Sequence, residues 1–236
     1  MGLATCRAGK VFILYDAERL CDATAEAPPG PRLLDPDHWR RQGRVTGEAP
    51  GRGASLFLDA GAGGEWVLRP YRRGGLVARL SATRYLWTGL ARTRAFRELR
   101  LTAELHELGL PVPRPVAAAV TRHGLTYEAA LITERISGAR ALASRLEDKR
   151  ADGTLLEEVG RTIRRFHDAG LDHVDLNARN LLVDDQERVW LIDLDRCRRR
   201  PKGDWQAGNL ARLERSLVKF GAPGAMATIR RGYEEP

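Results

Sequence analysis

The sequence predicts an α+β fold with two lobes, an N-terminal lobe built on an antiparallel sheet and a small, mostly helical C-terminal lobe. Three observations lead to this prediction: the segment HVDLNARN at 173–180, an aspartate thirteen residues after it in VWLIDLD, and the order of strand-like and helix-like runs along the chain. At 236 residues, the chain is long enough for one domain with a substantial core. We expect the lobes to be residues 1–135 and 136–236.

Strands are expected mainly in the first lobe, where short apolar runs alternate with glycine-rich and proline-rich segments. Residues 1–50 are expected to be largely irregular, apart from one strand at 11–15 and a proline-rich loop at 28–36. The other expected strands of this lobe are 54–58, 65–69, 116–121 and 125–133, with a glycine-rich turn at 60–64.

One helix is expected in the first lobe and three in the second. Residues 92–109 carry apolar side chains near helical spacing, and the pattern ends at Gly109, with Pro111 and Pro113 following. The expected helices of the second lobe are 141–147, 155–169 and 205–220, the last of the chain.

The segment HVDLNARN fits the pattern H-x-D-L-x-x-x-N, and Asp193 follows it at the end of a predicted hairpin. The hairpin consists of a strand at 180–183, a turn at 184–187 and a return strand at 189–192. It would bring Asn180 and Asp193 to the same end. Two carboxylates and one amide at this spacing are what phosphoryl transfer from a metal-bound nucleotide requires. We therefore expect Asp175 to orient and deprotonate the acceptor hydroxyl, and Asn180 and Asp193 to hold Mg²⁺.

Aspartate and asparagine are also frequent in turns and helix caps, so one motif alone would be weak support for catalysis. Two motifs in the right order, joined by a hairpin of suitable length, favour the catalytic interpretation. We expect His173 to support the loop by hydrogen bonding and not to act as a base. Asp195 could be a second metal contact or could cap the turn, and we favour the turn.

A wider resemblance rests on GRGAS at 51–55, WVLRPYRRGGL at 66–76, TGLARTRAFREL at 88–99, HVDLNARN, LIDLDRCR at 191–198 and NLARLERSL at 209–217. On these segments, the chain resembles the protein-kinase-like superfamily. Within it, the chain resembles the lipopolysaccharide core kinases, most closely those that act on 3-deoxy-D-manno-octulosonic acid (Kdo). The resemblance extends from about residue 15 to residue 220, and it implies a protein-kinase-like fold and an ATP- and Mg²⁺-dependent activity.

The resemblance assigns further residues to binding of the nucleotide phosphates. Gly51 and Gly53 would form a short glycine loop whose backbone N–H groups approach the phosphates. Arg69 would replace the lysine that most kinases place against the α- and β-phosphates, because no lysine lies nearby. Its expected ion-pair partner on the following helix is Glu98, with Glu104 as the alternative.

The same resemblance places a hinge at the end of the strand ALITERI. The backbone from Glu134 to Ile136 would hydrogen-bond the adenine. One position departs from the protein-kinase pattern: Asn177 stands where those enzymes carry a lysine that contacts the γ-phosphate. Arg179 or arginines on the acceptor side could supply that charge.

The net charge of +8 comes almost entirely from arginine, with one cluster between residues 69 and 100 and a second between 196 and 202. Such surfaces attract anionic lipid headgroups, phosphorylated or carboxylated sugars, or nucleic acid, although a merely solvated basic surface is the alternative for any single arginine. The three cysteines lack the spacing of metal ligands and predict neither a zinc site nor a disulfide framework. No apolar stretch is long enough to span a membrane or resembles a signal peptide.

The resemblance therefore implies an ATP-dependent kinase that phosphorylates a hydroxyl of Kdo, the 4-hydroxyl by family expectation, on Kdo-lipid A or a related anionic glycolipid. We expect it to act as a peripheral protein on the anionic membrane surface at the cytoplasmic face of the bacterial inner membrane, without a nucleic-acid partner. The alternatives are a lipopolysaccharide heptose kinase and a nucleotide-binding pseudokinase scaffold. An aminoglycoside-type or protein kinase is disfavoured, because the chain is short and its acceptor-binding lobe is basic.

Overall fold

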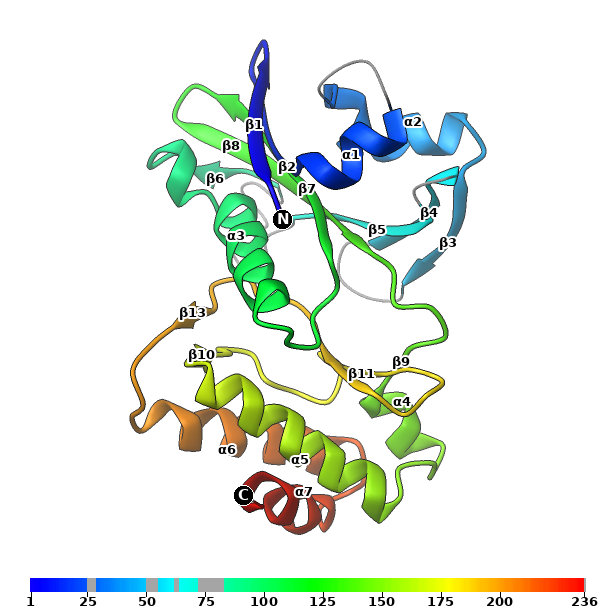
Figure 1. Cartoon of the computed structure of the whole chain (residues 1–236), viewed down its shortest axis with the longest axis vertical. Helices are drawn as coiled ribbons and strands as arrows, with labels where there is room; N and C mark the ends of the chain where they lie inside the picture. Colours follow the sequence, from blue (N-terminus) through cyan, green and yellow to red (C-terminus); the bar gives the residue numbers. More distant parts are fainter. Residues whose placement is uncertain (25–28, 50–54, 62–63, 72–82, 236) are drawn as a thin grey trace. The chain divides into compact units, whose positions relative to one another are not determined.

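The computed structural model describes residues 1–24, 29–49, 55–61, 64–71 and 83–235, without the side chains of 21–24. The residues group into two compact units (Figure 1). The first consists of Met1–Glu104 and Arg114–Arg135, and the second of Leu105–Pro113 and Ile136–Pro236. The segment 105–113 thus groups with the second unit although it precedes residue 135 in the sequence.

The first unit is built on an antiparallel sheet whose strand order is β1-β2-β7-β8-β5-β4-β3, with β6 paired to β8. The strands are β1 (Leu3–Ala8), β2 (Val11–Asp16), β3 (Val45–Ala49), β4 (Ser55–Asp59), β5 (Glu65–Pro70), β6 (Tyr85–Leu86), β7 (Pro115–His123) and β8 (Thr126–Glu134). The strands predicted from apolar runs are present here, each with its ends moved by a few residues.

The prediction that residues 1–50 are largely irregular is wrong. Strand β1 pairs with β2 along its whole length, and helices α1 (Ala17–Thr24) and α2 (Pro36–Arg41) follow, with a 3-10 turn at Pro31–Leu34 between them. The segment LATCRA of β1 has no strong apolar pattern, so its conformation depends on pairing with its neighbour. Helix α2 did carry a local signal, because Asp35 caps it and Pro36 occupies its first position.

Both faces of this sheet are buried, which explains why its central strands are continuously apolar. Neighbouring residues point to opposite faces: Ile13 and Ile132 belong to one apolar cluster, while Leu14 and Leu131 belong to the other. The first cluster includes Leu20, Leu34 and Trp39 from α1, the 3-10 turn and α2. The second includes Ala95, Phe96 and Leu99 from helix α3 (Arg94–Glu107) (Figure 1).

The second unit is mostly helical, with short strands between the helices. The helices are α4 (Leu142–Glu147), α5 (Gly153–Asp168), α6 (Trp205–Lys219) and α7 (Ala225–Glu234). Strands β9 (Arg140–Ala141), β11 (Leu181–Val183) and β12 (Val189–Leu191) form one small sheet, and β10 (Leu171–Asp172) pairs with β13 (Arg198–Arg199). The α+β class and the mostly helical second part agree with the prediction.

Helix α7 was not predicted, and its packing against α5 explains why it forms. The two helices cross at glycines: a Cβ atom on Gly160 would lie 2.1 Å from the Ile229 carbonyl oxygen, and one on Gly232 would lie 2.0 Å from the Glu157 carbonyl oxygen. Without side chains at these positions, the two backbones can approach closely. The helix therefore depends on a tertiary contact, because Gly232 in its interior lowers its intrinsic propensity.

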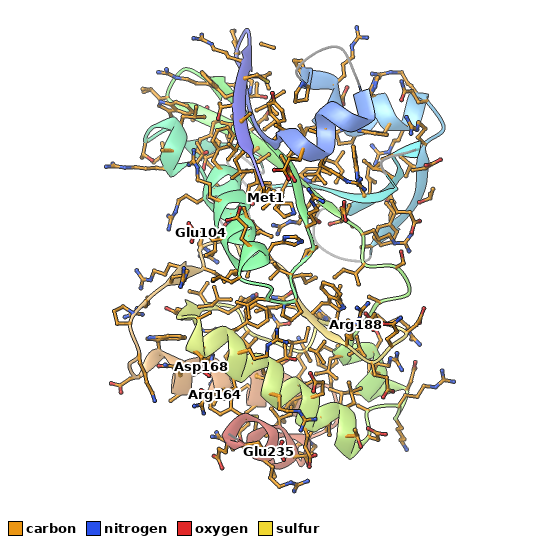
Figure 2. The ribbon with its side chains drawn as sticks, viewed as in Figure 1. Met1, Glu104, Arg164, Asp168, Arg188 and Glu235 are labelled. Atoms are coloured by element: carbon orange, nitrogen blue, oxygen red, sulfur yellow. The ribbon has the colours of Figure 1, made fainter. Side chains whose placement is uncertain are left out.

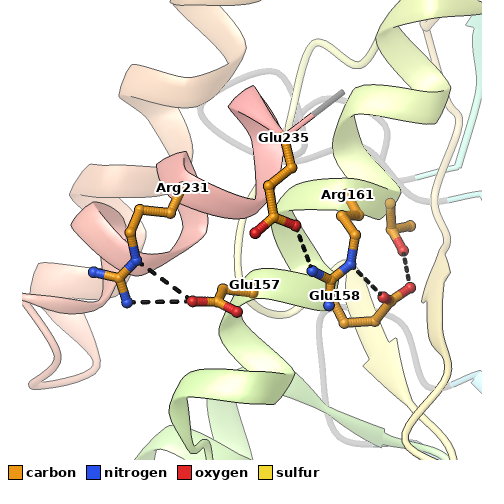
Figure 3. Close-up of polar contacts among 6 residues, drawn as sticks. Glu157, Glu158, Arg161, Arg231 and Glu235 are labelled. Carbon is orange, nitrogen blue, oxygen red and sulfur yellow. Dashed lines mark hydrogen bonds and ion pairs between the residues drawn. The ribbon is translucent and has the colours of Figure 1, made fainter.

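Ion pairs flank this glycine crossing at the surface. Arg231 of α7 pairs with Glu157 at 3.3 Å, and Arg161 of α5 pairs with Glu235 at 2.7 Å and with Glu158 at 2.9 Å (Figure 3). A further pair within α5 joins Arg164 and Asp168 at 2.9 Å (Figure 2). Pairs this exposed contribute little each, so the buried apolar residues and the close backbone contact hold the two helices together.

In the described parts of the chain, no helix is both long and apolar enough to cross a membrane.

Candidate active site

In the first unit, strand β5 and helix α3 bring together a buried carboxylate, a cation and a phenol. The Arg69 guanidinium forms an ion pair with Glu98, and the hydroxyl of Tyr71 donates a hydrogen bond to the same carboxylate. The side chain of Glu98 is only 3% exposed, whereas that of Arg69 is 26% exposed. Each carboxylate oxygen of Glu98 thus has a donor, which is what allows a charge to be buried at this depth.

The alternative partner, Glu104, is exposed on α3 (Figure 2), so Glu98 and not Glu104 pairs with Arg69. Glu98 lies on the buried face of the helix beside Phe96 and Leu99, and the apolar pattern alone did not distinguish the two glutamates. Tyr71 was not predicted as a site residue. Its signal was available, because it follows Arg69 by two positions and therefore lies on the same side of the extended chain.

The other residues assigned to nucleotide binding are placed as follows. Gly51 and Gly53 lie outside the described residues. Glu134 ends β8; its N–H donates to the Arg114 carbonyl oxygen (2.9 Å), and its carboxylate pairs with Arg19 of α1 (2.6 Å). Ile136 is the first residue of its segment in the second unit, and its carbonyl oxygen accepts from the Ala139 N–H (3.3 Å).

In the second unit, the hairpin expected after HVDLNARN is present. Strands β11 and β12 pair in the register Leu181 with Leu191 and Val183 with Val189. The turn is closed by Asp184, whose carboxylate accepts from the backbone N–H groups of residues 186 and 188 and from the indole of Trp190 (2.9–3.0 Å). The Asp184 carboxyl accordingly has a lowered pKa, because these bonds outweigh the effect of its burial.

The hairpin joins the segment 173–180 to the segment that carries Asp193. Ile192 donates its N–H to the Asn180 carbonyl oxygen (3.0 Å), and its own carbonyl oxygen accepts from His173 Nε2 (3.1 Å). The residue immediately before Asp193 is therefore bonded to the first and last residues of HVDLNARN. The bond between Ile192 and Asn180 continues the hairpin register, in which Leu181 pairs with Leu191.

Asp175 and Asn180 are connected inside this loop. The side-chain amides of Asn177 and Asn180 both donate to the Asp175 carbonyl oxygen, each at 2.9 Å. The Asp175 side chain itself is exposed, whereas Asn180 is buried. Since the Asn180 Nδ2 atom is engaged in this way, the orientation of its amide leaves Oδ1 directed away from that carbonyl, as an oxygen ligand requires.

Asp193 and Arg196 both adopt the left-handed backbone conformation, with φ values of 61°. For residues with a Cβ atom this region is unfavourable, and such residues persist only where the surrounding structure imposes them. Asp195 lies between these two residues in the sequence. Its carboxylate is 3.9 Å from the Arg196 guanidinium, and its backbone carbonyl oxygen accepts from the Cys197 thiol at 3.7 Å. The strained turn fixes the direction in which the Asp193 carboxylate leaves the backbone.

His173 is buried, and the burial lowers its pKa, so that its imidazole is neutral at pH 7. The bond to the Ile192 carbonyl requires the proton on Nε2. The ring is only 1% exposed and its Nε2 proton is held by a carbonyl oxygen, so it supports the loop and is out of reach of an acceptor hydroxyl in solvent.

Helix α6 supplies contacts to the 173–180 loop that the sequence did not predict. Asn209 accepts from the His173 N–H (2.9 Å) and donates to the buried carboxylate of Asp172 (3.1 Å), which also accepts from Arg200 (3.0 Å). Further along α6, the Ser216 hydroxyl oxygen accepts from the Ala178 N–H (3.0 Å). A polar residue at an otherwise apolar, buried helix position, as at Asn209, was the signal that could have revealed this support.

The donor set of the second unit suits a hard cation. Mg²⁺ prefers oxygen ligands and keeps several waters, so one or two protein oxygens are sufficient. Asn180 and Asp193 carry such side-chain oxygens, on loops that the same hairpin brings together. Among the described residues, no group of three or more His, Cys, Asp or Glu side chains forms a metal site of the cage type.

Comparison with known proteins agrees with the two-motif pattern. The model of the "Lipopolysaccharide kinase (Kdo/WaaP) family" matches residues 36–233. Among similar proteins is a "3-deoxy-D-manno-octulosonic acid kinase" from Stenotrophomonas maltophilia (strain R551-3), 47% identical over 98% of this chain and 90% of the relative. A protein of the same name from Vibrio cholerae serotype O1 is 44% identical over 84% of this chain and 83% of the relative.

Among solved structures, "WaaP in complex with acyl carrier protein" matches with a TM-score of 0.55 and 20% identity, over 87% of this chain and 86% of the other. At this identity, the structural match establishes only a common fold. The match of the family model along most of the sequence and the identity of nearly one half to full-length relatives go further: the chain belongs to the lipopolysaccharide kinase (Kdo/WaaP) family.

Proposed function

We propose that this protein is an ATP-dependent Kdo kinase, which phosphorylates a hydroxyl of Kdo on Kdo-lipid A or a related anionic glycolipid, with the 4-hydroxyl as the acceptor. The single observation that carries the proposal is the loop of the second unit, in which the Asn180 amide donates to the Asp175 carbonyl oxygen and one hairpin joins Asn180 to the segment that carries Asp193. The names of the full-length relatives support Kdo as the acceptor sugar.

In this proposal, Asp175 is the catalytic base. Its exposed carboxylate accepts the proton of the acceptor hydroxyl while that oxygen forms a bond to the γ-phosphorus and the bond from phosphorus to the β,γ-bridging oxygen breaks, releasing ADP. The backbone at Asp175 is kept in place by the hydrogen bonds that the side chains of Asn177 and Asn180 donate to its carbonyl oxygen. The hydrogen bond from the His173 N–H to Asn209 adds to this support. A fixed backbone limits the positions that the carboxylate can reach, which is the requirement for orienting a hydroxyl.

Mg²⁺ bound with ATP would supply positive charge against the charge that develops on the phosphates. Asn180 and Asp193 would hold it through their side-chain oxygens. Arg69, oriented by Glu98 and Tyr71, would contact the α- and β-phosphates, and its exposed fraction leaves part of the guanidinium accessible. Gly51, Gly53, and the backbone of Glu134 and Ile136 complete the proposed nucleotide-binding set, with residues 1–135 and 136–236 as the two lobes.

The decisive experiment measures transfer of labelled phosphate from ATP to three acceptors: a Kdo-bearing lipid A precursor, free Kdo and a heptosylated lipid. We expect transfer to the Kdo-bearing precursor, dependent on Mg²⁺ and strongly reduced in Asp175→Ala. Label on heptose in the hydrolysed product would instead identify a heptose kinase. Binding of ATP with no transfer to any acceptor would identify a pseudokinase. Location of the label on the sugar by NMR tests the 4-hydroxyl.

A further inference from the structure

We propose that one end of the first unit's sheet is a membrane-docking surface, in which Leu86 and Leu125 insert between the headgroups of an anionic phospholipid bilayer. This surface, called here the turn surface, consists of Arg7, Lys10, Leu86, Trp87, Arg122 and Leu125. The inference rests on the proposed function, because a kinase of a lipid-linked sugar has to reach a bilayer.

The two leucines occupy positions where a polar side chain would be expected. Leu86 follows the buried Tyr85 on β6 and therefore points away from the core, with 70% of its surface exposed. Leu125 lies in the turn between β7 and β8, directly after Gly124, and is 81% exposed. Single exposed leucines are ordinary, but these two lie on adjoining segments, since Leu86 pairs with Thr126 and the Trp87 N–H donates to the Leu125 carbonyl oxygen (2.9 Å).

Trp87 and the cations connect the leucines to the adjacent turn. The guanidinium of Arg122 lies 4.9 Å from the centre of the Trp87 ring, and the Arg122 N–H donates to the Lys10 carbonyl oxygen (3.0 Å). Trp87 also lies 6.1 Å from Phe12, whose ring is in contact with the guanidinium of Arg7. A half-buried tryptophan with arginines over aromatic rings is typical of the boundary between headgroups and acyl chains.

The charge of this end of the sheet is strongly one-sided. The segments 6–13, 83–93 and 119–129, which lie at or near this end, contain five arginines or lysines and a single carboxylate, Glu128. That carboxylate pairs with His123. In the described part of the chain, Arg7, Lys10 and Arg122 have no carboxylate partner within salt-bridge distance.

A bilayer fits this combination better than an acidic protein would. An acidic protein would satisfy the cations, but two leucines that project from a short strand and a turn offer it no groove. A bilayer accepts projecting aliphatic side chains among its acyl chains, while its headgroup phosphates meet lysine and arginine at the same depth. The charge complementarity and the two exposed leucines therefore point to the same partner.

The test is sedimentation of the purified full chain with phosphatidylcholine vesicles that contain 30% phosphatidylglycerol. We expect Leu86→Asn together with Leu125→Asn to lower the partition coefficient by about tenfold or more, because two aliphatic side chains no longer leave water. The matched control is Leu108→Asn with Val218→Asn, two aliphatic residues that are 55% and 56% exposed elsewhere and should leave binding unchanged.

The charge of the turn surface is tested separately. Replacement of Arg7, Lys10 and Arg122 by Gln should weaken binding to these vesicles several-fold, and raising the salt should weaken binding of the unaltered chain. Neutral phosphatidylcholine vesicles should bind much less. Brominated lipids should quench fluorescence in the unaltered chain more than in Trp87→Phe, because Trp87 would lie at the headgroup boundary.

The proposal is overturned if the unaltered chain does not bind the anionic vesicles, which would favour an acidic protein as the partner. It is also overturned if the Leu86/Leu125 variant binds as well as the unaltered chain, or if the Leu108/Val218 control loses binding equally. Transfer to a deacylated, water-soluble Kdo acceptor is measured alongside and should be the same for all variants. A chain that binds vesicles through these leucines but transfers no phosphate would contradict the proposed function and leave the docking surface standing.

Discussion

The side-chain amide of Asn180 donates a hydrogen bond to the backbone carbonyl oxygen of Asp175, at 2.9 Å. The residue proposed to hold the cation thus also steadies the residue proposed to remove the acceptor proton. Asn177 makes the same bond at the same distance. The two asparagines therefore differ in their proposed contact with Mg²⁺ and not in their contact with Asp175.

This difference gives the first prediction. Asn180→Ala should raise the Mg²⁺ concentration needed for half-maximal transfer by about tenfold or more, because a ligand of the cation is removed. Asn177→Ala removes the same hydrogen bond to Asp175 and should leave the Mg²⁺ requirement nearly unchanged. The measurement is transfer rate against Mg²⁺ concentration for both variants. Equal shifts in the two would remove Asn180 from the metal site.

The second prediction concerns Asp175. Asp175→Ala should lower kcat by about 10²–10⁴-fold, which is the usual contribution of positioned acid–base groups, while the Kd of ATP stays close to its original value. Asp168→Ala is the control, since it removes an exposed carboxylate of α5 that is paired with Arg164. Single-turnover transfer measures the effect on the chemical step, and equilibrium binding measures the Kd of ATP. Near-normal turnover in Asp175→Ala would show that another group accepts the proton.

The third prediction concerns the buried carboxylate of Glu98. Arg69→Ala should destabilise the fold by about 3 kcal/mol, because the carboxylate loses its compensating charge, and it should lower activity strongly. Arg69→Lys keeps the charge without the forked geometry of the guanidinium, so it should retain part of the stability and part of the activity. Tyr71→Phe should cost about 1–3 kcal/mol, because one buried carboxylate oxygen loses its donor.

These effects are measured by denaturant unfolding and by the KM for ATP. Glu104→Ala is the matched control on the same helix, and it should change neither quantity, because Glu104 is exposed. Full activity in Arg69→Ala would mean that the phosphates are contacted by another cation.

The fourth prediction tests the glycine crossing of α5 and α7. Gly160→Ala should destabilise the protein by about 1–3 kcal/mol or more, since its Cβ atom would lie 2.1 Å from the Ile229 carbonyl oxygen and backbone must move. Gly208→Ala makes the same change inside α6, where, outside the adjacent residues and the backbone of the same helix, no atom of the described residues lies within 4 Å of the added carbon. This variant should raise the free energy of unfolding by about 0.5–1 kcal/mol, because alanine has a higher helix propensity than glycine. The same sign for both changes would contradict the packing explanation.

The fifth prediction is a pH dependence of stability. His167 is buried beside Tyr233 and Trp205, and desolvation lowers its pKa from 6.5 to about 4. As the pH falls, His167 is therefore protonated near pH 6.5 in the unfolded chain but only near pH 4 in the folded chain. The free energy of unfolding should be unaffected by this group above pH 6.5 and should fall below it, by about 3 kcal/mol at most.

Urea unfolding between pH 7 and pH 4.5 measures this dependence. His167→Gln cannot take up the proton, so its free energy of unfolding should fall less over the same range. The variant starts from a lower value, because it loses the ring contacts with Trp205 and Tyr233. Parallel curves for the two proteins would show that His167 is not responsible.

Much of the candidate site was predictable because its residues lie close together in the sequence. The spacing of Asp175, Asn180 and Asp193 predicted a hairpin, and the hairpin is present with its register set by β11 and β12. Turn residues, strand periodicity and glycine breaks are local signals, and they also located α3, α5, α6 and most strands of the first unit.

The missed elements share a physical cause. The strand β1 and the helix α7 have weak local patterns and form because a neighbour covers them. Asn209, Ser216 and Tyr71 are ordinary polar residues in sequence, and only their partners make them part of the site. A contact across the fold depends on two segments that the local pattern does not relate.

The sequence by itself determined the α+β class, the order of most strands and helices, and the hairpin of the 173–193 region on which the proposed catalytic and metal-binding residues lie, because each depends on spacing within about twenty residues. The tertiary structure decided which glutamate pairs with Arg69, since Glu98 and Glu104 differ only in the face of α3 that they occupy and in what covers it. It also decided that Asn209 holds His173 and that α7 forms against α5. Burial determines each of these outcomes, because a charge, an amide or a glycine becomes structurally important only where water is excluded from its surroundings.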